Sequence, residues 1–164
     1  METIKDIGKT DASTLANYVL KNYGAMSHLK LQKLLYYSQA YHLAYFNNPL
    51  FDDDFEAWMH GPVCRRVFRE LRGASVLYSD VSFSTESKDP NPEIEAKLNT
   101  LQVQFVNEIL TALSKWSGME LESATHGEMP WLNARSGYGP ADPCTVIIKK
   151  EDMQSYYKKD LSSR

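Results

Sequence analysis

Few residues in this sequence have the types and spacing that enzyme or metal chemistry requires. The histidines lie far apart, and none belongs to an H-E-x-x-H motif or another close pair of metal ligands: His28, His42, His60 and His126. The best nucleophile candidate is Cys64, which follows His60 by four residues and precedes Arg65. A reactive thiolate needs a base held beside it in space, which proximity in sequence does not supply. We therefore expect no catalytic residue and no bound metal. An enzyme centred on Cys64 and His60, or on His126, is the alternative.

Motifs that bind nucleotides or phosphate are also missing from the sequence. There is no P-loop and no G-x-S-x-G elbow. Residues 137–140 contain a G-x-G, but Pro140 removes an N–H that a phosphate cradle would use, so a turn is expected. The run of three aspartates at 52–54 is typical of a solvated acidic turn rather than of paired catalytic carboxylates. No cofactor is expected.

Arginines at helical spacing are the clearest candidates for contact with a partner. Arg65, Arg69 and Arg72 follow one another at i, i+4 and i+7, which places them on one face of a helix. Guanidinium groups there could bind the carboxylates of an acidic protein or the phosphates of a nucleic acid. The alternative is a solvated face on which Glu70 is a local partner.

Tyrosine is abundant, with ten residues in the chain. Its ring favours burial while its hydroxyl tolerates a wet interface, so the count fits both an aromatic core and a binding surface. Tyr138 in the glycine-rich loop, and Tyr156 and Tyr157 near the C-terminus, are the tyrosines expected to be free for a partner.

The composition is that of a soluble globular protein. The chain has 164 residues, 43% of them hydrophobic and 24% charged, which fits one domain with a substantial core. The net charge of −3 argues against dominant binding to nucleic acid or to an anionic membrane. Two cysteines outside any C-x-x-C pair indicate a reducing compartment. Without a signal peptide or a long apolar segment, the chain is expected to be cytoplasmic.

Hydrophobic periodicity predicts helices along most of the chain. The first is expected over residues 11–23, with Asp11 as its N-cap. The second, over 27–46, is apolar around nearly its whole circumference, which predicts a buried central helix. A third is expected over 62–72, with Pro62 in its first turn.

The second half of the chain continues the helical pattern. Ser117 begins a capping box for one of its helices. The expected elements, in order, are a loop over 74–92 with a short strand near 76–83, a helix over 92–116, a helix from 117 to about 127, a helical turn over 131–135, an extended segment over 145–148 and a helix over 150–160. The fold class is therefore mainly α: a single compact helical domain of about six to seven helices with minor short β segments.

Three blocks of sequence resemble the Panacea-domain family, which includes SocA-like antitoxins and GepA-like phage-associated proteins. The blocks lie at 29–40, at 49–63 and at 121–135, in the family's order. The residues that carry the resemblance are Leu31, Gln32, Lys33, Leu34, Tyr36 and Tyr37 in the first block, Trp58, His60, Gly61, Pro62 and Val63 in the second, and His126, Pro130, Trp131 and Arg135 in the third. The resemblance implies one domain over 1–164 with its core at about 11–160.

The resemblance also implies a function. A member of this family would be an antitoxin that neutralises a cognate toxin protein by direct binding, or an adaptor that delivers the toxin to a cytoplasmic AAA+ protease. Because toxins paired with the family are diverse, the shared motif residues are expected to maintain the fold rather than to recognise one toxin. A prophage-encoded nucleic-acid-binding protein or enzyme is the second alternative, and a homo-oligomer is compatible with the sequence.

Overall fold

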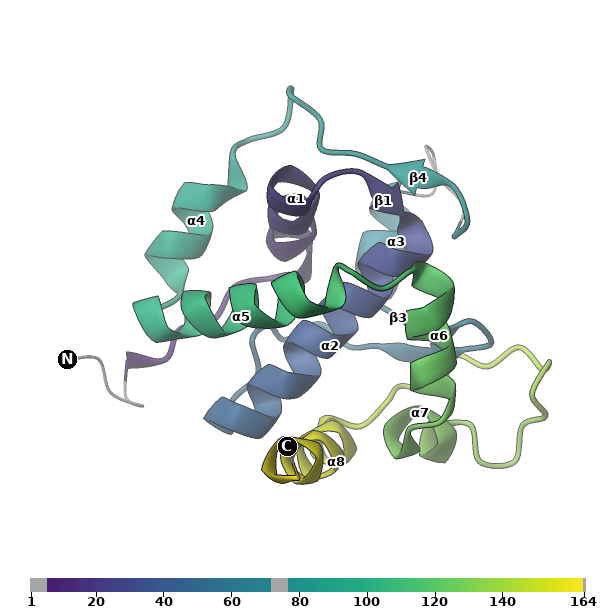
Figure 1. The fold of residues 1–164 in the computed structure, drawn as a ribbon. Helices are drawn as coiled ribbons and strands as arrows, with labels where there is room; N and C mark the ends of the chain where they lie inside the picture. The colour runs from purple at the N-terminus through teal and green to yellow at the C-terminus, as the bar shows by residue number, and fades with distance from the viewer. Residues whose placement is uncertain (1–5, 72–76, 164) are drawn as a thin grey trace.

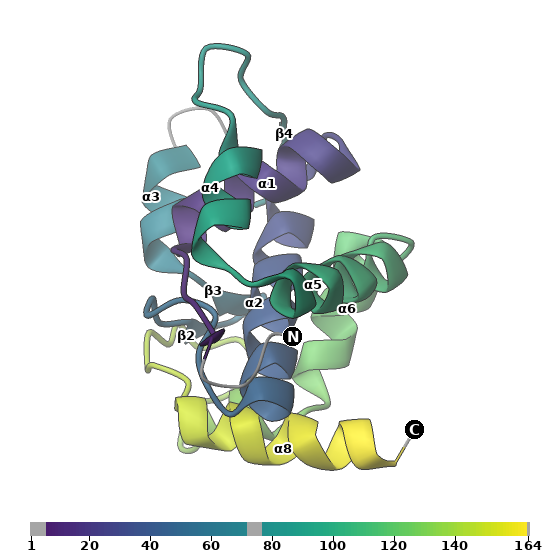
Figure 2. The same ribbon diagram turned by 90° about the vertical axis from the view of Figure 1, so that its left-hand side faces the viewer.

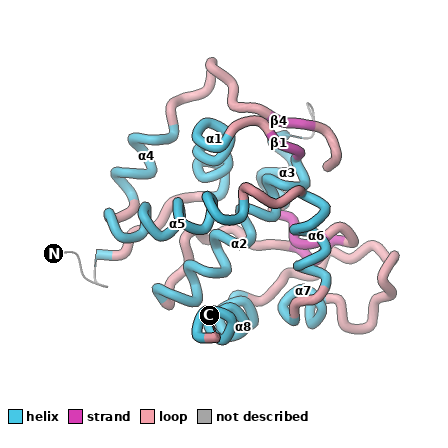
Figure 3. The backbone as a smooth tube through the Cα atoms, viewed as in Figure 1, coloured by secondary structure: helices cyan, strands magenta, loops and turns pink. Residues whose placement is uncertain are grey.

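One helix forms the centre of the molecule, and the other elements pack around it. The computed structural model describes residues 6–71 and 77–163. Within them the helices are α1 (Ala12–Tyr23), α2 (His28–Phe46), α3 (Arg65–Leu71), α4 (Pro90–Lys97), α5 (Thr100–Leu113), α6 (Gly118–His126), α7 (Met129–Ala134) and α8 (Lys150–Ser162). The strands are β1 (Met26–Ser27), β2 (Glu56–Trp58), β3 (Gly61–Val63) and β4 (Asp80–Val81). Figures 1 and 3 show α2 surrounded by helices and the strands confined to short stretches. The expected mainly helical fold class is confirmed.

The central helix is buried on every side. Ser27 caps α2 by accepting a hydrogen bond from the Lys30 N–H, and Asn47, in the left-handed conformation, ends it. Every residue of α2 except Lys30 and Tyr45 is buried, so the all-round apolar pattern correctly predicted its position. Figure 2 shows α8 lying across the C-terminal end of α2.

A buried polar side chain of α2 forms hydrogen bonds with the backbone of the loop that follows the helix. The amide of Gln39 accepts from the Leu50 N–H at 2.7 Å and donates to the Phe51 carbonyl at 2.7 Å. A loop packed against a helix must satisfy its own N–H and C=O groups, and a buried glutamine provides both partners. The segment after α2 is therefore fixed on the helix surface although it has no regular structure.

A two-stranded hairpin of β2 and β3 follows this loop. The strands are antiparallel and pair Glu56 with Val63, Ala57 with Pro62 and Trp58 with Gly61. The expectation of a helix over 62–72 is wrong at its start, because Pro62 belongs to β3 and α3 begins at Arg65. Proline lacks an N–H, so it is tolerated in a short edge strand as well as at a helix start. Arg72 lies outside the described residues.

The expected single helix over 92–116 is two helices. Helix α4 ends at Lys97, and α5 starts at Thr100 after a capping box formed by Asn99 and Gln102. The Gln102 side chain also hydrogen-bonds the N–H and the C=O of Gly8. The apolar stripe continues across the break, which is why periodicity alone predicted one long helix.

The remaining elements agree with the expectations in outline. Ser117 and Glu120 form the capping box of α6. Strand β4 pairs with β1, within the region where a short strand was expected, although residue 76 lies outside the described part. In the expected extended segment, Ile147 forms an antiparallel bridge with Glu56. Among the described residues, no helix combines the length and the apolar character needed to cross a membrane.

Candidate interaction site at the hairpin

Side chains from α3 and β2 form a compact charged and aromatic group on the hairpin. Arg65 donates two hydrogen bonds to the Glu56 carboxylate, at 2.7 and 2.6 Å, and its guanidinium lies 5.6 Å from the centre of the Trp58 ring. The Trp58 indole donates to the same carboxylate at 2.9 Å, and its ring meets Phe68 edge to face. Burial alone would raise the pKa of Glu56. The hydrogen bonds from Arg65 and Trp58, together with the charges of Arg65 and Arg69, outweigh this effect, so the pKa lies below its ordinary value.

The central helix holds the other strand of the hairpin. Gln32 accepts from the Cys64 N–H at 2.8 Å, and the Lys33 ammonium donates to the Pro62 carbonyl at 2.9 Å. Lys33 is fully buried, and this burial lowers its pKa to about 7, although the nearby Glu122 carboxylate raises it in part. The first two sequence blocks therefore meet through a buried lysine and a buried glutamine.

Gly61 makes this contact geometrically feasible. Its φ of 98° lies in the left-handed region. A Cβ on this residue would lie 2.6 Å from Lys33 Cε and 2.9 Å from Thr125 Oγ1. Any side chain here would therefore collide with α2 and α6 as well as strain the backbone.

The third sequence block binds the backbone of β2. Trp131 donates from its indole to the Trp58 carbonyl at 2.8 Å. Arg135 is buried and donates to the Ala57 carbonyl at 2.9 Å and to the carbonyls of Gly139 and Asp142 at 2.8 and 2.6 Å. These bonds join the hairpin, α7 and the loop after α7 into one unit.

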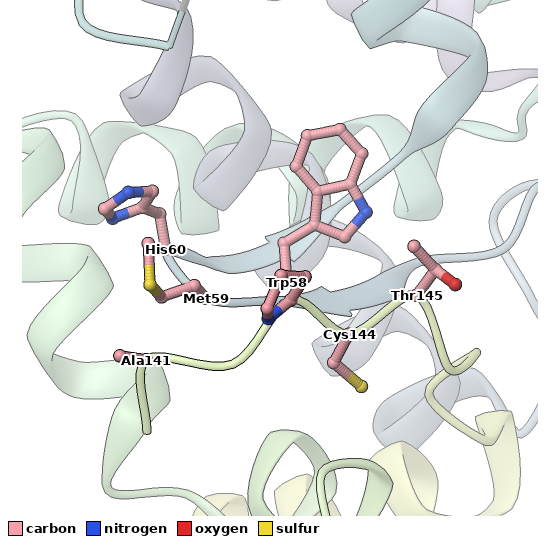
Figure 4. A pocket seen from close by; sticks show the side chains of 7 residues that line it. Trp58, Met59, His60, Ala141, Cys144 and Thr145 are labelled. Carbon is pink, nitrogen blue, oxygen red and sulfur yellow. The ribbon is translucent and has the colours of Figure 1, made fainter. Parts of the chain in front are cut away.

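An open cavity lies beside this unit. It has a volume of about 240 Å³ and is lined by Trp58, Met59 and His60 on the hairpin and by residues 141 and 143–145 on the loop before α8. Figure 4 shows Trp58, Met59 and His60 on the hairpin, with Ala141, Cys144 and Thr145 on the loop that runs beside it. Its lining is mostly apolar, apart from the His60 ring and the Thr145 hydroxyl.

The sequence matches the model of the family described as "Antitoxin SocA-like, Panacea domain" over residues 31–132, which is more than half of the chain. The chain belongs to this family. It is also 39% identical over 144 residues to the protein named Antitoxin SocA of Caulobacter vibrioides (strain NA1000 / CB15N), a match that covers 82% of this chain and 76% of that protein. No solved structure matches.

In this Panacea domain, the two described arginines of the expected face, Arg65 and Arg69, differ in their partners. Arg65 is bound to Glu56, and the neighbouring Arg66 forms an ion pair with Asp53 at 2.8 Å. Arg69 is exposed and forms no ion pair within the described part of the chain. The acidic turn is paired as well: Asp52 and Asp54 bind Lys9 and Lys150.

The three candidate tyrosines of the Panacea domain differ in exposure. Tyr138 is 46% exposed, and Tyr156 is half-buried. Tyr157 is fully buried, with its hydroxyl hydrogen-bonded to Tyr36 at 3.2 Å and to Glu128 at 2.6 Å. The premise that Tyr157 is free for a partner is therefore wrong. Sequence reasoning also missed Glu128, which binds Tyr37 and Tyr157 together, because nothing in its local sequence points to them.

The alternative enzyme site at Cys64 is not assembled. The Cys64 side chain is buried, and this burial raises its pKa to about 11, so the thiol is protonated at neutral pH. His60 instead contacts the Tyr78 hydroxyl at 2.9 Å and Glu122 at 3.5 Å. His126 stacks on Trp131 at 4.2 Å. No group of three or more histidine, cysteine or acidic side chains in the described residues could hold a metal ion.

Proposed function

We propose that this chain is an antitoxin that neutralises a cognate toxin by direct, stoichiometric binding. The observation that carries the proposal is the similarity to Antitoxin SocA along most of the chain. The geometry at Cys64 supports binding over turnover, because the thiol is protonated and has no base hydrogen-bonded to it among the described residues.

The expected division between fold-maintaining and partner-binding residues is part of this proposal. The motif side chains Gln32, Lys33, Trp131 and Arg135 bind hairpin backbone, which would fix the same scaffold whatever toxin is bound. Toxin recognition would then belong to exposed residues around that scaffold, of which Arg69 and Tyr138 are the accessible anchors.

The test is co-expression with the product of the adjacent reading frame, followed by affinity capture at low and high salt. We expect a one-to-one complex that weakens at high salt, because charged groups at an interface rim are screened. Rescue of growth by far less protein than toxin, without any complex, would overturn the proposal. Rescue that disappears in a strain lacking a cytoplasmic AAA+ protease, although the complex still forms, would replace neutralisation by delivery to that protease.

A further inference from the structure

The segment before α8 forms an incomplete third strand of the hairpin sheet. The Ala57 N–H donates to the Val146 carbonyl at 2.8 Å, and the Ile148 N–H donates to the Phe55 carbonyl at 2.8 Å. These two bonds flank the pair of Glu56 and Ile147, which is therefore a non-hydrogen-bonded pair of an antiparallel ladder. In such a pair the N–H and C=O of Ile147 point away from β2, and no described residue hydrogen-bonds to them.

The bridged part of this edge carries neither proline nor charge, although Pro143 and Lys149 flank it. Neither proline nor a charged residue occurs at 145–147, and the β-branched side chains of Val146 and Ile147 are 39% and 49% exposed. Natural sheet edges are normally protected by lysine, proline or a covering element. An open edge with exposed β-branched residues favours pairing with an extended segment of another chain.

The cavity continues from the same edge. Thr145 lines it and lies two residues before Ile147, and in an extended strand residues two apart face the same side. If a partner strand pairs with Ile147, its residue two positions from the one opposite Ile147 would lie opposite Thr145, at the mouth of the cavity. The volume of about 240 Å³ and the mostly apolar lining suit one large apolar side chain.

Two exposed cations lie near the edge. Arg65 and Glu56 neutralise each other directly opposite Ile147. Arg69, whose charge acts on Glu56, and Lys149, which follows the edge segment, are exposed and form no ion pair with any described residue. Two such cations beside an open edge select for acidic residues in the segment that binds there.

We propose that an extended, acidic segment of the toxin adds as a strand to the edge at Val146 and Ile147 and inserts one apolar side chain into the cavity lined by Trp58, Met59 and Thr145. This inference rests on the proposed function, since it names the surface by which the toxin would be bound. The apolar groove of Tyr45, Leu101 and Phe105 is a competing surface, but nothing in the structure indicates what covers it.

Two pairs of variants test the edge in the captured complex. Ile147→Pro removes the outward N–H but no hydrogen bond of the fold, whereas Ile147→Ala keeps the N–H. We expect Ile147→Pro to weaken toxin binding by about tenfold or more and Ile147→Ala to weaken it less, because both lose the side chain but only proline loses the donor. Arg69→Glu should also weaken binding by about tenfold, whereas Arg69→Lys should change it by less than about threefold.

Matched controls lie far from the edge. Leu101→Ala removes a side chain that is 44% exposed, and Lys115→Glu reverses an exposed charge. Neither should change affinity by more than about twofold. In the wild-type complex, amide hydrogen exchange should slow at 145–147 and remain unchanged at Tyr45 and Leu101.

The outcomes separate this inference from the proposed function. If wild-type protein captures the toxin but Ile147→Pro, with an unchanged melting temperature, captures it equally well, the edge is not the toxin surface and the antitoxin function stands. If the isolated chain forms a dimer that Ile147→Pro abolishes, the edge binds a second copy and the inference is overturned. If wild-type protein forms no complex at all, the proposed function fails, and this inference fails with it.

Discussion

Gly61 is the residue on which contact between the hairpin and the central helix most depends. It combines a φ of 98° with the close approach of Lys33 and Thr125. Gly61→Ala should lower the free energy of unfolding by about 2–4 kcal/mol, from backbone strain and overpacking together. Gly137 is the matched control, because its φ of 90° is similar but nothing lies within 4 Å of the position that an alanine methyl group would take. Gly137→Ala should cost only about 1 kcal/mol. Equal costs in urea unfolding would show that the contact with Lys33 is unimportant.

Lys33 gives the fold a dependence on pH. Its pKa is about 7 in the folded protein and 10.5 ordinarily, so the unfolded chain binds more protons than the folded one between these values. Stability must then rise with pH across this window. The buried thiol of Cys64 has the opposite effect above its ordinary pKa of 9.0, where only the unfolded chain loses the proton.

The free energy of unfolding is therefore best measured between neutral pH and the ordinary thiol pKa of 9.0, below which Cys64 keeps its proton in the unfolded chain as well. From about pH 7 to about pH 8.5, the free energy of unfolding should increase by about 1–2 kcal/mol. Lys33→Met should remove most of this increase, whatever its effect on stability at one pH. A slope that is unchanged in Lys33→Met would assign the pH dependence to another group.

At the break between α4 and α5, two separate helices and one continuous helix predict opposite effects of the same substitution on stability. Asn99 caps α5 by accepting from the Gln102 N–H at 2.8 Å. Asn99→Ala should destabilise the protein by about 1 kcal/mol through loss of the cap, and Asn99→Asp should preserve stability. In one continuous helix, Asn99→Ala would be stabilising, because alanine has the higher helix propensity. Thermal denaturation of the two variants decides between them.

The elements that sequence could predict are those defined by local interactions. The N-caps Asp11, Ser27 and Ser117 bond to residues three positions ahead, so the starts of α1, α2 and α6 can be read directly from the sequence. The hairpin could not be predicted in this way. Its strands are only three residues long, and Trp131 and Arg135, which bind its backbone, lie more than seventy residues further along the chain.

For the whole molecule, the sequence identified the motif residues, but it did not indicate which of them contact one another in the fold. The three motif blocks named Lys33, Trp58 and Arg135, but their convergence on one hairpin follows from tertiary packing. Tyr157 was expected to be free for a partner near the C-terminus. It is buried because Tyr36, Tyr37 and Tyr41 of α2 surround its ring. Side-chain partners at this distance in sequence leave no local pattern.

The central claim is that this Panacea domain acts by stoichiometric binding, and a titration of toxin activity tests it most directly. Purified chain would be added in steps to a fixed amount of the adjacent gene product, at a toxin concentration well above the dissociation constant, with toxin activity measured at each step. We predict a linear loss of activity that ends at a molar ratio of about one, because each bound antitoxin is consumed. Complete, time-dependent loss of activity at a small fraction of that ratio would contradict the claim and indicate an enzyme.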